Sequence, residues 1–133
     1  MPTPLRLLPL ATLALLAACT TQAPSTLTLE QQSRYCDPLV LHEGQEFSLR
    51  LPSNPTTGFR WVMNESAAPA LKQLGPEVYS TPEDAGVVGS AGVSTWRFRA
   101  VARGEGRLAL DYRRPWENAV PAAKRFDCRI TVK

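Results

Sequence analysis

Apolar and polar residues alternate one by one over much of the chain, which is the period expected for β-strands that bury one face. The clearest alternation lies at residues 46–51, 59–64, 95–100, 107–112 and 126–132, and shorter apolar runs lie at residues 39–42, 70–74 and 78–79. Glycine-containing turns at residues 43–45 and 102–106 separate some of these segments. The pattern therefore predicts a chain that is almost entirely β.

Strands with one apolar face cannot bury that face singly, so two sheets have to pack against each other. The strands fall within residues 35–133, about a hundred residues, which is the usual size of one domain with a modest core. We therefore expect an all-β domain, an immunoglobulin-like β-sandwich of about seven or eight strands. Trp61 and Trp96 are in register with apolar neighbours and are expected in its core.

Several connections are richer in turn-forming residues than a hairpin needs. Residues 54–58 read Asn-Pro-Thr-Thr-Gly, where a short Asn-Gly or Asp-Gly turn would suffice. Residues 80–92 end in Gly-Ser-Ala-Gly, and residues 113–124 begin with Arg-Arg-Pro-Trp-Glu. Because alternate connections of such a sandwich emerge at the same end, we expect these three loops to form one surface.

The first residues have the layout of a secretory signal. Arg6 precedes an apolar run over residues 7–16, and small residues lead to Cys19. Leu-Ala-Ala-Cys resembles the lipobox of bacterial lipoproteins, in which the cysteine is acylated, for example with palmitate, and becomes the mature N-terminus. We expect residues 1–18 to be a lipoprotein signal peptide, Cys19 to be lipidated and residues 19–34 to be a flexible tether. An ordinary signal peptide followed by a chance cysteine is the alternative.

Charge and cysteine content limit the functions open to the domain. The formal net charge is +3 with basic and acidic residues interspersed, so a nucleic-acid surface is not expected. If Cys19 carries lipid, Cys36 and Cys128 are left as an even pair in an exported, disulfide-permissive protein, and we expect them to be bonded. Neither has a second cysteine nearby, and His42 is the only histidine, so no metal site and no cofactor are predicted.

The loops together carry a family resemblance that covers nearly all of residues 39–133. NPTTGF after a strand ending in Leu-Pro-Ser, a Gly-x-x-Gly segment before an apolar strand and Arg-Pro-Trp after a later strand are similar, in order and separation, to the chagasin-type inhibitors of papain-like cysteine peptidases. The resemblance implies an immunoglobulin-like sandwich whose loops wedge reversibly into the peptidase cleft without being cleaved. It implies these peptidase-binding residues: Asn54, Pro55, Thr56, Thr57, Gly58, Phe59, Gly89, Ser90, Ala91, Gly92, Arg114, Pro115 and Trp116.

Each loop also has a plainer interpretation. Pro55 and Gly58 would stiffen the first loop and present its two threonines, or the segment is only a structural turn. Relatives usually show Gly-x-Gly-Gly where this chain has Ala91, whose methyl group would cost on the order of 1 kcal/mol at φ above zero, unless the segment is only a flexible connection. Trp116 would be an exposed aromatic anchor, with Arg114 bracing the loop or reaching a carboxylate on the partner, or else it folds back over the core.

Two other classes of protein fit the sequence less well. An enzyme is not expected, because no nucleophile, base and orienting group converge in the pattern. A non-inhibitory envelope lipoprotein with an immunoglobulin-like binding or structural role would share the leader, tether and sandwich, but would have no need of the three loop motifs together. We therefore expect a monomeric, reversible and tight-binding inhibitor of papain-like cysteine peptidases, anchored in the membrane through Cys19 at the periplasmic face of the outer membrane.

Overall fold

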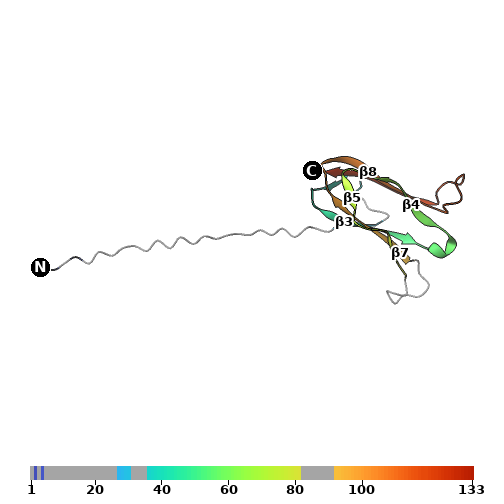
Figure 1. Cartoon of the computed structure of the whole chain (residues 1–133), viewed down its shortest axis with the longest axis horizontal. Coiled ribbons are helices and arrows are strands. Elements are labelled where there is room, and N and C mark those ends of the chain that lie inside the picture. Colours follow the sequence, from blue (N-terminus) through green and yellow to red (C-terminus); the bar gives the residue numbers. More distant parts are fainter. Residues whose placement is uncertain (1, 3, 5–26, 31–35, 82–91) are drawn as a thin grey trace.

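The computed structural model describes residues 2, 4, 27–30, 36–81 and 92–133, and Figure 1 shows its course. The described residues form nine strands and one short 3-10 helix, η1. The bounds are β1 (Leu27–Glu30), β2 (Leu39–Leu41), β3 (Glu46–Ser53), η1 (Pro55–Thr57), β4 (Arg60–Ser66), β5 (Leu71–Gln73), β6 (Val78–Ser80), β7 (Gly92–Ala100), β8 (Gly104–Arg113) and β9 (Lys124–Val132). In this described part, no helix has the length and apolar character that crossing a membrane requires.

The strands form two sheets, which confirms the predicted β-sandwich. The first sheet has the order β1-β3-β7-β5, and β6 also pairs with β7. The second sheet has the order β2-β9-β8-β4. Most neighbours are antiparallel, whereas β1 pairs with β3 and β2 pairs with β9 in parallel.

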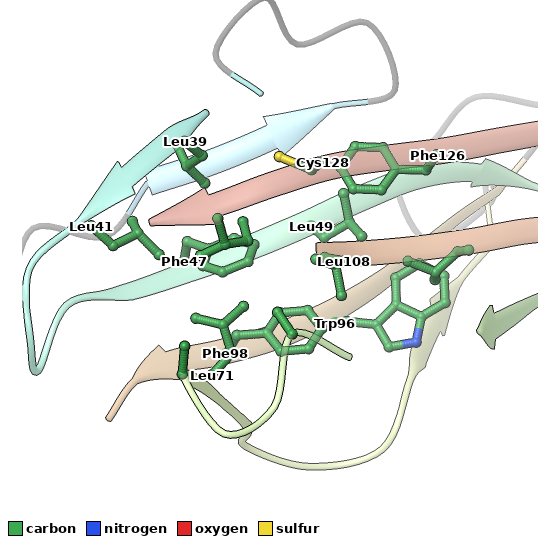
Figure 2. Close-up of a cluster of buried hydrophobic side chains, with 14 of the residues drawn as sticks. Leu39, Leu41, Phe47, Leu49, Leu71, Trp96, Phe98, Leu108, Phe126 and Cys128 are labelled. Carbon is green, nitrogen blue, oxygen red and sulfur yellow. The ribbon is translucent and has the colours of Figure 1, made fainter. Parts of the chain in front are cut away.

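The core lies between the sheets, where the apolar positions of the alternating pattern meet (Figure 2). Phe47 of β3 stacks on Phe98 of β7 with 5.1 Å between ring centroids, and both side chains are fully buried. Trp61 and Trp96 are also buried, as predicted. Burying a side chain of leucine or phenylalanine size stabilises a fold by about 1.5–3 kcal/mol, so this layer is the main source of stability.

A disulfide joins Cys36 to Cys128, with their Cα atoms 4.7 Å apart. Cys36 lies just before β2, and Cys128 is a buried residue of β9. The bond therefore ties the entry of the chain into the second sheet to the last strand, beside the parallel pairing of β2 with β9.

The expectation of a flexible tether is wrong for residues 27–30. These residues form β1, and Leu27 is partly buried against the core. The sequence Leu-Thr-Leu-Glu has the alternation of a short strand, and it covers an edge of β3 that would otherwise be free for pairing. The rest of the predicted tether, most of the predicted signal peptide and Cys19 lie outside the described residues.

One face of β8 also differs from the prediction. Ala109 and Asp111 occupy positions expected to face solvent, yet both are buried. β8 lies between β9 and β4, and the Arg125 side chain of β9 lies across Asp111 with Nε 2.7 Å from Oδ1. The hydrogen bond from Arg125, helped by one from Asn64 and by the charges of Arg125 and Arg113, holds the pKa of Asp111 below its ordinary value.

Candidate functional site

The strand registers bring the first and third predicted loops, and the two described ends of the second, to one end of the sandwich. Ser53 at the end of β3 is opposite Gly92 at the start of β7. Arg60 at the start of β4 is opposite Arg113 at the end of β8. The first loop (residues 54–59) and the third loop (residues 114–123) consequently project from the end opposite the C-terminus (Figure 1). Of the second loop (residues 81–91), only residue 81 is described, so Gly89, Ser90 and Ala91 lie outside the described residues.

The first loop is a tight turn built on Pro55 and Gly58. Asn54 has an extended backbone, with φ −133° and ψ 85°, which suits a residue that precedes proline. Pro55 begins η1, and Gly58 ends it with φ +82°, where its N–H donates to the carbonyl of Pro55 at 3.1 Å. Gly58 therefore has the left-handed conformation that glycine adopts without strain.

Both threonine hydroxyl groups of this loop are used within the loop. Thr56 Oγ1 donates to Asn54 Oδ1 at 2.5 Å, and Thr57 Oγ1 donates to the Asn54 carbonyl at 2.8 Å. Both residues nevertheless remain exposed. The hydroxyl protons thus stiffen the loop and are not free for a partner.

Tyr112 of β8 anchors the first loop to the second sheet. Its hydroxyl accepts a hydrogen bond from the Asn54 N–H at 2.9 Å, and its ring stacks on Phe59 with 5.2 Å between centroids. Trp61 packs on the same ring at 4.9 Å. Phe59, predicted to bind a partner, is therefore half-buried in an aromatic cluster that attaches the loop to the core. Tyr112 is not among the residues predicted for the site, although its place opposite Trp61 in the β4–β8 pairing puts it there.

The third loop is bonded directly to the first. Arg114 Nε donates to the Thr57 carbonyl at 3.1 Å, and its guanidinium lies 4.7 Å from the centroid of the Phe59 ring. Arg114 also forms an ion pair with Glu117 at 3.1 Å within its own loop. Of the two roles considered for Arg114, the structure thus shows the bracing contacts.

Trp116 lies against Gly58. A methyl group added at Gly58 would lie 2.5 Å from Cη2 and 3.3 Å from Cζ2 of the indole, so the ring edge rests on the glycine backbone. Trp116 is nevertheless 67% exposed, and Pro115 beside it is exposed as well. Trp116 is therefore not folded back over the core, and Gly58 is required both for its φ and for this contact.

Gly92 plays a different part from the one predicted. It is buried at the start of β7, and an added methyl group would lie 2.4 Å from the Tyr79 hydroxyl oxygen and 2.5 Å from the Ser80 carbonyl oxygen. The missing side chain leaves room for β6 of the same chain. Gly92 is consequently not a surface for close approach by a partner.

The sandwich projects two mutually braced loops from one end, and an exposed tryptophan lies where the loops meet. This architecture is typical of a protein that binds a partner through its loops. The chain belongs to the chagasin family: the sequence profile of the Chagasin family peptidase inhibitor I42 matches residues 40–130.

Individual relatives agree with this assignment. The chain is 30% identical to chagasin of Trypanosoma cruzi over 90 residues, which is 66% of this chain and 82% of chagasin. It is 30% identical to amoebiasin-1 of Entamoeba histolytica over 78 residues, 59% of this chain and 74% of that protein.

Solved structures show the same fold. The solution structure of amebosin aligns with a TM-score of 0.58 and 26% identity, covering 82% of this chain and 99% of amebosin. A cysteine protease inhibitor from Entamoeba histolytica aligns with a TM-score of 0.65, covering 81% of this chain and 95% of that one. At 14% identity, this second likeness concerns the fold alone.

Proposed function

We propose that this protein is a reversible, tight-binding inhibitor of papain-like cysteine peptidases, and that the loop end of the sandwich occludes the substrate cleft of the peptidase. The proposed role is binding, without catalysis by the chain itself. The single observation that supports it most is the rigid junction of the first and third loops, in which Trp116 rests on Gly58 and Arg114 bonds the Thr57 carbonyl. Family membership supplies the class of partner.

The loop geometry suits an inhibitor that is not cut. A peptidase cleaves a segment that can adopt an extended conformation in its cleft. Residues 55–57 are instead a 3-10 turn closed by internal hydrogen bonds, with Arg60 NH1 and Arg114 Nε donating to carbonyls of the same turn. A pre-ordered turn of this kind also lowers the entropy cost of association.

The exposed side chains of the third loop would supply the apolar contact area. Trp116 is 67% exposed and Val120 is 50% exposed, and neither is needed to cover the core. An aromatic side chain with few rotamers to freeze is a common interface anchor. We therefore place Trp116 against a wall of the peptidase cleft, with the first loop beside it at the catalytic residues.

The test is inhibition of papain by the purified protein at increasing molar ratios. We expect activity to fall, to recover after dilution, and the inhibitor to be recovered as an intact chain by mass spectrometry. Absence of inhibition in molar excess, or stoichiometric cleavage of the first loop, would contradict the proposal. Light scattering on the free protein and on the complex tests the proposed monomer and one-to-one complex.

We also propose that the inhibitor is held at the cell envelope by lipid on Cys19, on the periplasmic face of the outer membrane. The proposal is supported by the basic, apolar and small-residue order of residues 1–18 and by the Leu-Ala-Ala-Cys sequence. Mass spectrometry of the membrane fraction tests it. An unmodified Cys19, or an N-terminus elsewhere, would contradict it.

A further inference from the structure

Two arginines stand directly opposite each other at the base of the loops. Arg60 begins β4, Arg113 ends β8, and the two are register partners. Like charges in directly opposite positions of antiparallel strands destabilise the pair. The repulsion between the two charges is offset because both guanidinium groups donate hydrogen bonds to carbonyl oxygens of the loops.

Arg113 reaches into the third loop. Its NH2 group lies 3.0 Å from the Glu117 carbonyl oxygen, 3.1 Å from that of Val120 and 3.4 Å from that of Asn118. Its Nε is buried and has no hydrogen-bond partner among the described residues. The side chain is thus committed to the loop backbone at the cost of an unsatisfied donor.

Within the third loop, two of the described backbone bonds are local. The Glu117 N–H donates to the Arg114 carbonyl at 3.0 Å, and the Val120 N–H donates to the Glu117 carbonyl at 3.3 Å. These two turns follow each other. A third backbone bond, from the Ala123 N–H to the Tyr112 carbonyl at 2.9 Å, ties the last residue of the loop to β8 but does not hold the two turns. Arg113 joins both turns to the end of the strand, because it donates to carbonyls on each side of Asn118.

Arg60 makes the matching contact with the first loop. Its NH1 group donates to the carbonyls of Pro55 and Phe59, each at 2.9 Å. These carbonyls lie on the two sides of Gly58, whose left-handed conformation turns the chain. Arg60 therefore closes the same turn on which Trp116 rests.

We infer that Arg60 and Arg113 are positioning residues that hold the first and third loops in their binding conformation before a partner arrives. The inference rests on the proposed inhibitory function, and it assigns these arginines a role in which they need not touch the peptidase. If a variant keeps the binding conformation in only a fraction of its molecules, its apparent affinity falls by that fraction. A fall to about a tenth would raise the inhibition constant about tenfold.

The test uses Arg113→Gln, Arg113→Lys and Arg60→Gln, with Arg129→Gln as a control of equal charge change. Arg129 is exposed, pairs with Asp37, and lies near the opposite end of β9, opposite Arg107. Protein containing 5-fluorotryptophan gives one ¹⁹F resonance for each of its three tryptophans, and Trp116→Phe assigns the one from the third loop. Inhibition of papain and thermal unfolding are measured on the same samples.

We expect Arg113→Gln to shift the Trp116 resonance towards its position in the unfolded chain, while the Trp61 and Trp96 resonances stay in place. The inhibition constant should rise about tenfold, and Arg60→Gln should act in the same direction. Arg113→Lys should also weaken inhibition, because one ammonium group on a flexible stem does not reproduce the planar fork of donors. Arg129→Gln should change neither readout.

Several outcomes would overturn the inference. One is an unmoved Trp116 resonance in Arg113→Gln. A second is movement of all three tryptophan resonances, which would make Arg113 a general support of the core. A third is wild-type behaviour of Arg113→Lys, which would mean that charge alone matters. If the wild-type protein inhibits no papain-like peptidase, the proposed function fails, yet the ¹⁹F resonances of the free protein still decide whether the arginines order the loops.

Discussion

Substitution of Gly58 by alanine separates the backbone role of this residue from its contact with Trp116. Gly58 has φ +82°, a conformation that costs a residue with a side chain about 1–2 kcal/mol. The added methyl group would also lie 2.5 Å from Cη2 of Trp116, whereas ordinary carbon contacts need about 3.5 Å or more. The indole edge therefore has to move by about 1 Å.

The two effects should appear in different measurements. Because Trp116 is 67% exposed, its ring can move away without disturbing the core, so the free energy of unfolding should fall only by the backbone strain of about 1–2 kcal/mol. If Trp116 is the interface anchor, its displacement should weaken peptidase binding by on the order of 2 kcal/mol, which is about thirtyfold in the inhibition constant.

A matched control and a double-mutant cycle test this reasoning. Gly44 has φ +86° but no atom within 4 Å of an added methyl group, and it lies in the turn at the opposite end of β3. Gly44→Ala should therefore lower stability by a similar amount and leave inhibition unchanged. In the Trp116→Ala background, Gly58→Ala should raise the inhibition constant by less than about threefold, because the side chain that it displaces is gone.

Additive effects would refute the reasoning. If Gly58→Ala weakens inhibition of papain equally with and without the Trp116 side chain, the contact between them does not position the anchor. The same conclusion follows if Gly58→Ala and Gly44→Ala both leave inhibition unchanged. Denaturant unfolding curves recorded for each variant keep the loss of folded protein apart from the loss of affinity.

Three further variants test the core, the charge network and the second loop. Trp61→Ala should lower the free energy of unfolding by roughly 3 kcal/mol or more, because it empties a buried site, and a loss under about 1 kcal/mol in urea titrations would contradict that. The lowered pKa of Asp111 stabilises the fold above the ordinary pKa of an aspartate, and this contribution is lost as the pH falls through the folded value. The difference in melting temperature between wild type and Asp111→Asn should therefore shrink from pH 7 to below about pH 4, and a constant difference would exclude the linkage. Ala91→Gly should tighten inhibition of papain or leave it unchanged, and clearly weaker inhibition by a folded variant would show that the alanine suits a particular peptidase.

The alternating pattern predicts the fold well because burial of one strand face is a local property. The positions of Phe47, Leu49, Trp96 and Phe98 follow directly from a period of two, and so does the need for a second sheet. β1 is missed because four residues of alternation are too few to outweigh the polar sequence around them. Asp111 is misplaced because its burial on the outer face of β8 depends on the Arg125 side chain of β9, which a pattern within one strand does not contain. Ala109 is misplaced on the same face of β8, between β9 and β4.

The loops were also predicted from their sequence, together with the support that Pro55, Gly58 and Arg114 give within them, but the supporting residues on the strands were not. Support depends on which residues of two strands are opposite each other, and the β4–β8 register shifts between Met63 and Glu65, an irregularity that no local pattern reveals. Tyr112 and Arg113 belong to the site only through that register. Gly92 shows the converse: a sequence cannot distinguish a glycine that leaves room for a partner from one that leaves room for Tyr79 of the same chain.

The site and the core meet at Trp61. The first loop leaves β3 in the first sheet and enters β4 in the second, so its shape depends on how far apart the two sheets are held at this end. Trp61 fills that space: its ring packs on Tyr112, and its Nε1 donates to the Pro52 carbonyl of β3 at 3.0 Å. Tyr112 in turn accepts the hydrogen bond from Asn54 that opens the loop. A change that moves the Trp61 ring therefore displaces the start of the first loop and, through Gly58, the surface on which Trp116 rests.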